Sequence, residues 1–332
     1  KFLAGTLGMG AGLALGREGP TVQMGASLAY QVGRLMRQDG ADCRVLMAAG
    51  AGAGFAVAFN APIAGALFVF EGLLKRFEAR LVIAALAASA VAIWVGRAIL
   101  GNTPEFTAPP LTAPGLDQVP FFAVLGIAAG LAGTLYNRTL LATLRMTDRF
   151  PGLRVEWRAA IVGAAVGAIA WCAPWLVGGG DGLAQQALRG EGSLVVLPAL
   201  FFVRLGLIAC SVGAGAPGGL LVPFLALGAE LGLWLGLLCA LAFPGLAVEP
   251  AGFAVVGMAA LFTAIVRAPV TAMVLVTEMT ASQTMLLPMV VACFAALLVS
   301  VRFDGRSILD ALKEHALAHR AQRDTVPSTA RP

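Results

Sequence analysis

Long apolar runs constrain the fold of this chain more than any other feature of its sequence. Six of them reach or approach the ~20 residues that a helix needs to cross a bilayer. They cover residues 81–94, 121–135, 159–177, 194–212, 220–243 and 286–301. Transmembrane barrel strands would alternate polar and apolar residues, and these runs do not. With 59% hydrophobic and 12% charged residues, the composition excludes a soluble globular protein. The sequence therefore predicts an all-α polytopic membrane protein.

A charged pair lies in the apolar chain within the motif Gly16-Arg17-Glu18-Gly19-Pro20. Ionisable residues at membrane depth are costly and mark functional sites. Pro20 stands where a helix would begin, and a helix N-terminus offers free backbone N–H groups to an anion. Because Glu18 can occupy the place of that anion, the motif predicts an anion site with a protonatable plug. The alternative role of Glu18 is a salt bridge to a neighbouring arginine.

Two pairs of similar segments occur in the same order in the two halves of the chain. Residues 20–29 are similar to residues 223–232, and residues 60–71 are similar to residues 267–278. Repeated halves are common in transporters, whose broken helices meet near the membrane midplane with their N-termini facing an anion. The two proline-headed segments are therefore expected to be paired site helices.

The repeats and the proline-rich break between them divide the chain into five parts. We expect an incomplete first transmembrane repeat (1–100), a linker (101–117), a second transmembrane repeat (118–303), a cytoplasmic terminal helix (304–322) and a disordered tail (323–332). The chain starts with a lysine and enters an apolar segment at once, so it is expected to lack its amino-terminal part.

Basic residues gather between apolar segments and near the carboxy-terminal end. The positive-inside bias favours a cytoplasmic location for the loop 75–80 and for the terminal helix, in a bacterial inner membrane. A net charge of +5 spread over helix flanks does not indicate a nucleic-acid surface. His315 and His319 lie four residues apart, which fits a solvated helix face better than a metal site. We expect neither a metal nor a cofactor.

Five motifs of this chain resemble those of the CLC family of chloride channels and chloride/proton exchangers, in family order over about residues 1–312. They lie at residues 16–23, 60–65, 215–223, 267–269 and 278–280. The resemblance implies an all-helical fold of two inverted repeats with broken helices that meet at a central anion site. It also implies a homodimer, surrounded by membrane lipid, in which each subunit has its own anion path.

The resemblance implies that Glu18 is the gating glutamate, whose ionised carboxylate occupies the outer anion position and which can also carry the proton. It assigns the anion site to the following residues: Gly16, Arg17, Glu18, Gly19, Gly219, Leu220, Leu221 and Leu309. The backbone amides of Leu220 and Leu221 are expected to face the central anion.

Several positions depart from the family pattern. Leu221 replaces the usual Phe of Gly-x-Phe-x-Pro, which changes the pore wall but not an amide ligand. Leu309 stands at the position of the central tyrosine, so a hydroxyl ligand is lost and the inner gate is expected to be looser. The tyrosines of the chain are Tyr30 and Tyr136. An early Gly-Ser-Gly-x-Pro motif is absent and would lie upstream of residue 1.

The inner end of the proton path also departs from the family pattern. Many exchangers carry two acids in a row where this chain has Glu71-Gly72, so Gly72 replaces the inner proton acid. Glu71 can substitute if the helix end shifts by one residue. Its alternative role is that of a helix-end charge paired with Lys75.

These features favour transport of chloride or a similar small anion, gated by Glu18. The protein is expected to be a voltage-gated chloride channel-like protein or a weakly coupled chloride/proton antiporter. A fluoride- or nitrate-selective member and a non-functional truncated remnant are alternatives. An intramembrane enzyme using Glu18 or Asp181 lacks support, because no metal cluster, nucleophile–base pair or phosphate loop occurs in the apolar segments.

Overall fold

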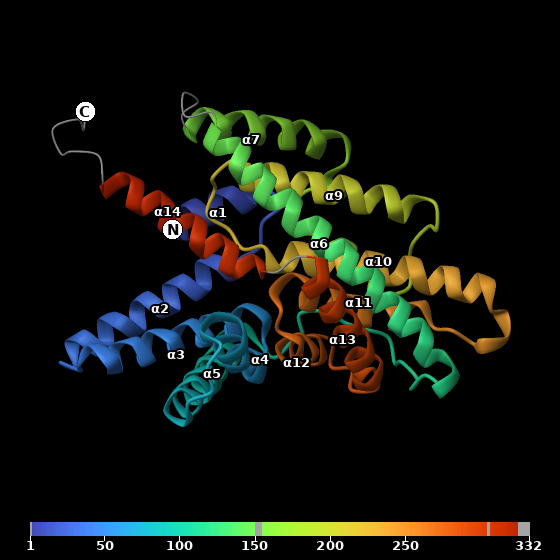
Figure 1. The fold of residues 1–332 in the computed structure, drawn as a ribbon, viewed down its shortest axis with the longest axis horizontal. Coiled ribbons are helices and arrows are strands. Elements are labelled where there is room, and N and C mark those ends of the chain that lie inside the picture. Colours follow the sequence, from blue (N-terminus) through green and yellow to red (C-terminus); the bar gives the residue numbers. More distant parts are fainter. Residues whose placement is uncertain (1, 150–154, 304–305, 325–332) are drawn as a thin grey trace.

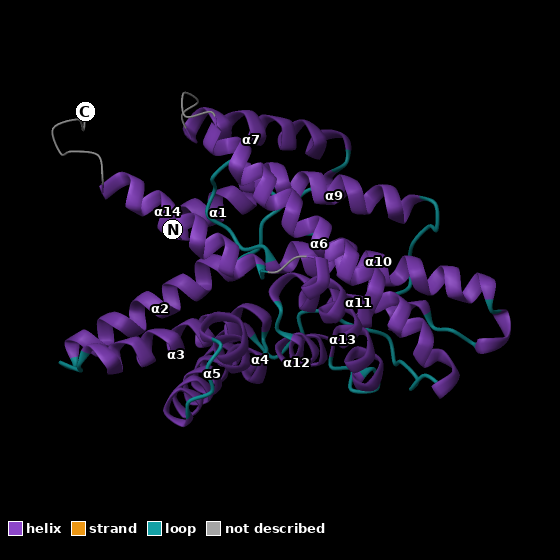
Figure 2. Ribbon diagram, in the orientation of Figure 1, coloured by secondary structure: helices purple, strands orange, loops and turns teal. Residues whose placement is uncertain are grey.

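The computed structural model describes residues 2–149, 155–303 and 306–324. Within these ranges the regular structure is helical, apart from one isolated backbone bridge between Gly16 and Gly219. Figures 1 and 2 show the helices and the loops that connect them. The prediction of an all-α chain is confirmed.

The first half of the chain forms five α-helices and one π-helical turn. They are α1 (Phe2–Gly10), α2 (Glu18–Leu35), α3 (Gly40–Phe59), α4 (Pro62–Leu67), the π-helix η1 (Phe68–Leu74) and α5 (Ala79–Leu100). Asp39 caps α3 by accepting a hydrogen bond from the Asp42 amide at 2.7 Å. The residue after α3, Asn60, has a positive φ of 51°, and a left-handed residue at this position commonly ends a helix.

The second half begins with a short 3-10 turn and contains the longest helix. Its elements are η2 (Leu116–Gln118), α6 (Val119–Arg149), α7 (Val155–Cys172), η3 (Pro174–Leu176), α8 (Asp181–Leu188), α9 (Val196–Gly213), α10 (Leu221–Ala242), η4 (Pro244–Leu246), α11 (Pro250–Val266), α12 (Pro269–Thr280), α13 (Leu286–Phe303) and α14 (Ile308–Asp324). The segment between α5 and η2 carries no helix, as the four prolines predict.

Seven helices of the described ranges are long and apolar enough to cross a membrane. They are α3, α5, α6, α7, α9, α10 and α13. Large apolar side chains on their outer surfaces remain exposed, such as Trp94, Trp171 and Leu298. Such faces suit hydrocarbon rather than water. Each of the six apolar runs of the sequence lies on a helix. The sequence analysis did not predict α3 as a membrane span, because glycines and alanines lower its hydropathy.

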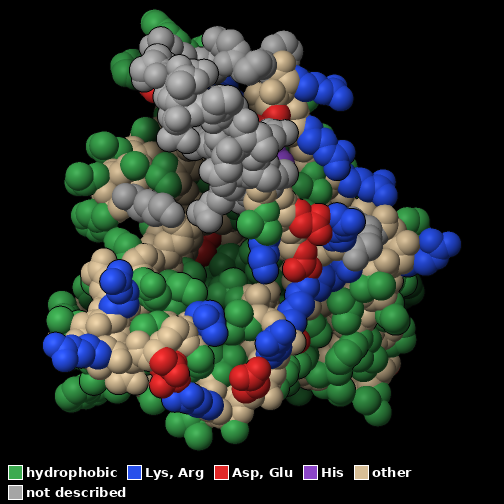
Figure 3. All heavy atoms as spheres, turned by 60° about the vertical axis from the view of Figure 1, so that its left-hand side comes forward, with side chains coloured by type: hydrophobic (Ala, Val, Ile, Leu, Met, Phe, Trp, Pro, Cys, Tyr) green, Lys and Arg blue, Asp and Glu red, His purple; other side chains and the backbone are tan. Residues whose placement is uncertain are grey.

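Basic side chains gather at one end of the helical bundle. Figure 3 brings the left-hand side of Figure 1 forward and shows Lys and Arg side chains crossing this face between hydrophobic flanks. The exposed basic residues from the loops of the first half include Arg37, Lys75 and Arg76. Lys75 forms an ion pair with Asp310 of α14, so the loop 75–80 and the terminal helix lie on the same side, as predicted.

The two halves repeat the same helix order. The series α2, α3, α4 with η1, and α5 is followed in the second half by α10, α11, α12 and α13. In each half the first two helices pack against each other through a pair of glycines. A methyl group added at Gly25 would overlap the Gly50 carbonyl oxygen, and one added at Gly228 would lie 2.6 Å from the Gly257 carbonyl oxygen. Gly25 and Gly228 are the matched glycines of the sequence repeat, so the repeat specifies the same close helix contact twice.

Helix α11 forms the centre of the molecule. Every residue from Ala251 to Val266 is buried. A helix that is apolar all round suits either a protein core or a lipid face, and this burial places α11 in the core. It packs against α10, α6 and α13.

Two of the proposed domain boundaries lie at helix ends, whereas the boundary between residues 117 and 118 falls inside η2. α5 ends at Leu100, and α13 ends at Phe303. The terminal helix α14 continues to Asp324, so residues 323 and 324 of the expected tail are helical. Residues 325–332 of that tail lie outside the described residues.

Candidate functional site

Two helix starts from opposite halves of the chain meet in the interior. Gly16, just before α2, and Gly219, just before α10, are joined by an antiparallel bridge. The Gly16 amide donates to the Gly219 carbonyl at 2.8 Å, and the Gly219 amide donates to the Gly16 carbonyl at 2.7 Å. Pro20 and Pro223 each stand at the third position of their helix rather than the first. This costs no hydrogen bond, because the first four amides of a helix have no intrahelical acceptor.

The carboxylate of Glu18 lies at the N-terminus of α10. The Glu18 side chain is 1% exposed. Its Oε1 atom accepts a hydrogen bond from the Leu221 amide at 2.5 Å, and the carboxylate also accepts one from the Val222 amide. These are the first amides of α10, which point outward from the helix and carry the positive end of its dipole. The Glu18 carboxylate thus occupies an anion position.

Glycines on both sides give this carboxylate its space. A methyl group added at Gly16 would overlap Oε2 of Glu18, and one added at Gly219 would overlap Oε1. At Gly19 an added methyl would lie 2.9 Å from the Gly218 carbonyl oxygen. The amides of Gly16 and Gly219 are engaged in their mutual bridge. These two glycines therefore shape the site, while Leu221 and Val222 supply the donors. Sequence reasoning missed Val222.

The Arg17 side chain points away from the buried carboxylate. It forms an ion pair with Glu105 in the linker, and half of it is exposed. This pairing replaces the salt bridge between Glu18 and an arginine that was considered as an alternative. Arg17 and Arg97 line a hollow of ≈ 250 Å³ together with Glu105.

A larger hollow lies at the start of α14. It has a volume of ≈ 460 Å³, and Arg145, Arg306 and Ser307 line it. The two hollows lie toward opposite ends of α5, because Arg97 is in its last turn while the ion pair of Lys75 with Asp310 lies near its beginning. Each hollow also contains an acid, since Arg17 pairs with Glu105 and Arg306 pairs with Glu314.

The position of Leu309 offers only an apolar side chain. It is half-buried and packs against the main hydrophobic core in the first turn of α14. A buried hydroxyl lies elsewhere, on Tyr136 of α6, which is 1% exposed. Its ring stands edge-on to Phe224 of α10, with 5.9 Å between the ring centroids. Sequence reasoning noted this tyrosine but gave it no role, although a hydroxyl within an apolar run was the available signal.

The Glu71 carboxylate lies at the start of α12 in the other half of the chain. It accepts hydrogen bonds from the amides of Val270 at 3.2 Å and Thr271 at 2.7 Å, and from the Thr271 hydroxyl at 2.7 Å. Lys75 pairs with Asp310 rather than with Glu71. Glu71 therefore caps a helix through both oxygens, and Gly72 beside it is buried.

The matched acid of the second half returns this interaction. Glu278 accepts hydrogen bonds from the amides of Ile63 at 3.1 Å and Ala64 at 2.9 Å, at the start of α4. Each half thus caps a helix of the other half.

Lys75, which directly follows η1, donates a hydrogen bond to Asp310 of α14 on the basic face. This hydrogen bond lowers the pKa of the Asp310 carboxyl below its usual value.

A second buried acid, Glu230 of α10, is separate from the site of Glu18. It is 1% exposed and interacts electrostatically with the fully buried Arg204 of α9. Arg204 donates to the carbonyls of Leu176, Gly178 and Gly179 at 2.7–2.9 Å. The two residues lie in the apolar runs 194–212 and 220–243, and nothing in those runs shows that their side chains pair.

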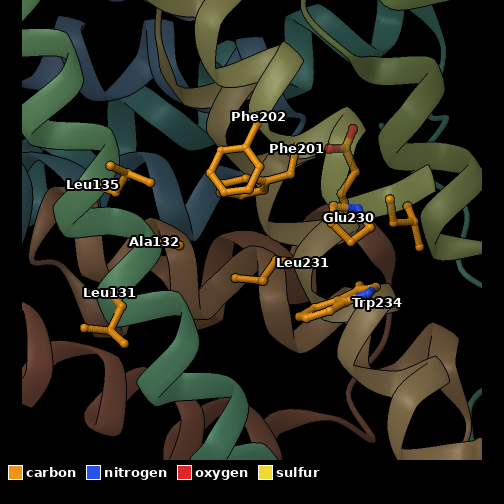
Figure 4. A pocket seen from close by; sticks show the side chains of 10 residues that line it. Leu131, Ala132, Leu135, Phe201, Phe202, Glu230, Leu231 and Trp234 are labelled. Atoms are coloured by element: carbon orange, nitrogen blue, oxygen red, sulfur yellow. The ribbon is translucent and has the colours of Figure 1, made fainter. Parts of the chain in front are cut away.

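The cavity next to Glu230 is apolar. It has a volume of ≈ 320 Å³, and leucine, phenylalanine and tryptophan side chains line most of it. Figure 4 shows the Glu230 carboxyl group turned away from Leu131 and Leu135 on the far side of the cavity. Such walls offer no ligand to an anion.

Comparisons with known proteins agree with this geometry. A family model described as voltage gated chloride channel matches residues 1–301. The H(+)/Cl(-) exchange transporter ClcA of Vibrio parahaemolyticus is 37% identical over 326 residues, which are 96% of this chain and 69% of that protein. The transporter of the same name from Yersinia pestis is 37% identical over 336 residues, 97% of this chain and 69% of that protein.

Solved structures of transporters share the fold. The chain superimposes on a slow cyanobacterial Cl-/H+ antiporter with a TM-score of 0.89 and 34% identity, covering 93% of this chain and 73% of that one. A eukaryotic CLC transporter has a TM-score of 0.76 at 24% identity, covering 91% and 53%, and supports the fold alone. These relatives are named as transporters rather than enzymes.

Proposed function

Because this chain belongs to the voltage-gated chloride channel (CLC) family, we propose that it exchanges chloride for protons across a bacterial inner membrane. Relatives named as H(+)/Cl(-) exchange transporters support this proposal, as does the structural similarity to a Cl-/H+ antiporter. The protein is an integral, multi-pass membrane protein.

One observation carries the mechanism: Oε1 of Glu18 accepts a hydrogen bond from the Leu221 amide at the start of α10. In our proposal the ionised carboxylate and chloride compete for these amides. Protonation removes the negative charge of Glu18 and weakens its hold on the helix terminus. The side chain then leaves with its proton, and chloride takes its place.

Backbone amides suit a transported anion better than a fixed cation would. They attract chloride through the helix dipole without the strength of a buried ion pair, so that the anion can leave again. Arg97 in one hollow and Arg145 in the other raise the local concentration of anions there.

We propose that protons reach Glu18 less efficiently here than in relatives with two consecutive acids. Gly72 has no titratable group, and both oxygens of Glu71 cap α12. Chloride then passes more often without a proton, which makes the protein a weakly coupled antiporter. The expected working form is a homodimer in lipid with one anion path in each subunit.

Chloride flux and proton movement, recorded together in proteoliposomes, test the proposed function. A chloride gradient should drive protons in the opposite direction. Replacing Glu18 with glutamine should abolish the proton movement and leave chloride flux, because the amide cannot release a proton. The matched control is Glu191→Gln, since Glu191 is exposed in the loop after α8. Chloride flux equal to that of empty liposomes would reject the transport proposal, and full proton coupling in Glu18→Gln would reject the gate.

A further inference from the structure

Tyr136 lies against the end of α10 that holds the Glu18 carboxylate. Its ring contacts Phe224, which belongs to the first turn of α10 and follows Leu221 closely in sequence. The tyrosine comes from α6, which packs against α10 and α11. A polar side chain thus reaches the candidate site from a helix that none of the sequence motifs includes.

Two buried atoms in this neighbourhood lack a hydrogen-bond partner among the described residues. They are the Tyr136 hydroxyl and Oε2 of Glu18. A phenol hydroxyl is a donor, and a carboxylate oxygen is an acceptor. Burying either one without a partner is unfavourable. Both groups are buried beside the first turn of α10, where Tyr136 contacts Phe224 and Glu18 accepts from the Leu221 amide.

The geometry points to Tyr136 as a hydroxyl ligand of the chloride that replaces the Glu18 carboxylate at the outer anion position. This inference rests on the proposed function, since it adds a ligand to the same anion path. Within the described part of the chain the hydroxyl has no partner while the carboxylate is in place, so it is free to donate to the incoming anion.

A hydroxyl suits this position for the same reason as the amides of α10. It donates one hydrogen bond to a negative group but carries no fixed charge that would trap the anion. Leu309 contributes no hydroxyl from α14. In this chain the neutral side-chain donor comes from α6 instead.

Chloride binding in the Glu18→Ala background tests the inference, because the carboxylate then no longer competes with the anion. Titration calorimetry on the detergent-solubilised protein should show that Tyr136→Phe lowers chloride affinity about tenfold, the loss of one hydrogen bond to a charged group. Tyr30→Phe is the matched control, since Tyr30 is exposed on α2 and should leave the affinity unchanged. Equal chloride affinity in the Tyr136→Phe variant and in its Glu18→Ala parent would overturn the inference while the proposed function stands. No chloride binding in that parent would overturn both.

A spectroscopic measurement keeps the inference testable if Tyr136→Phe fails to fold. The sequence contains two tyrosines, so labelling their ring carbon next to the hydroxyl with 13C gives two resonances, which Tyr30→Phe assigns. In the Glu18→Ala protein the Tyr136 resonance should shift on titration with chloride and the Tyr30 resonance should not. A Tyr136 resonance that does not shift at saturating chloride would refute the ligand role.

Discussion

Gly16 and Gly219 form two backbone hydrogen bonds with each other, 2.8 and 2.7 Å long, and the Glu18 carboxylate lies between these two glycines. The bridge joins the starts of α2 and α10, which belong to different halves of the chain. It fixes the distance between the residue that carries the carboxylate and the amides that bind it. Since neither glycine has a side chain, the same contact leaves room for an anion.

Replacing Gly219 with alanine should keep the fold but displace the carboxylate, because the new methyl group would overlap Oε1 of Glu18. Chloride flux in liposomes should then be lower and depend less on acidification than in the parent, because the methyl group fills space that both the Glu18 carboxylate and chloride use. Gly182→Ala is the control, because an added methyl there meets no atom within 4 Å. An unchanged pH dependence of chloride flux in Gly219→Ala would contradict the proposed position of the Glu18 carboxylate.

Replacing Gly25 with alanine should destabilise the protein. The methyl group would overlap the Gly50 carbonyl oxygen, so α2 and α3 must separate. Overpacking of this kind costs about 1–3 kcal/mol, which a thermal unfolding scan in detergent can detect. Gly163→Ala in α7 is the matched control, because it meets nothing within 4 Å and gains helix propensity. Equal melting temperatures for the two variants would show that the contact is not close.

Replacing Glu71 with alanine separates its two proposed roles. As a cap, Glu71 accepts from two amides and one hydroxyl at the start of α12. Its loss should cost about 1–3 kcal/mol of stability, while the ratio of proton to chloride flux remains that of the parent. If Glu71 lies on the proton path instead, proton flux should vanish while chloride flux persists.

The ion pair between Lys75 and Asp310 should hold α14 in place at neutral and mildly acidic pH. The hydrogen bond from Lys75 lowers the pKa of Asp310 in the folded protein, so its contribution is complete above the ordinary Asp pKa of about 4. The contribution is lost only as the pH falls below that value and through the folded pKa. The protection of the α14 amides against hydrogen exchange, taken relative to the intrinsic exchange rate at each pH, should therefore fall below about pH 4 but not between pH 7 and 5.

Asp310→Asn provides the control for this pH dependence. It should raise α14 exchange modestly at neutral pH, because both partners of the pair are partly exposed and screened. It should also remove the acid-dependent step. A loss of α14 protection already at pH 6 in the parent would point to another titrating group.

Local patterns in the sequence were enough to predict the helices and the repeat. The six apolar runs specify helices because bilayer length and composition act on each segment alone. Gly25 and Gly228 also revealed the repeat, since each must allow the same close helix approach. The CLC fold predicted from the motifs is confirmed by the family match and by the solved structures.

The partners of the buried polar groups could not be predicted in this way. Glu71 lies next to Lys75 in sequence, but its carboxylate reaches the start of α12 instead. Arg204 and Glu230 lie on different helices, α9 and α10, and the spacing of the two residues in the sequence does not show that their side chains meet. The residue roles assigned to the anion site, including that of Leu309, stay predictions until transport is measured.

Glu71 and Glu278 each cap a helix that belongs to the other half of the chain. A half produced alone would leave the amides at the start of α4 or of α12 without their carboxylate acceptor. Two separately translated chains, divided within residues 101–117, should therefore be degraded singly yet recover when made together. Through Glu71 and Glu278, the stability of each half therefore depends on the presence of the other.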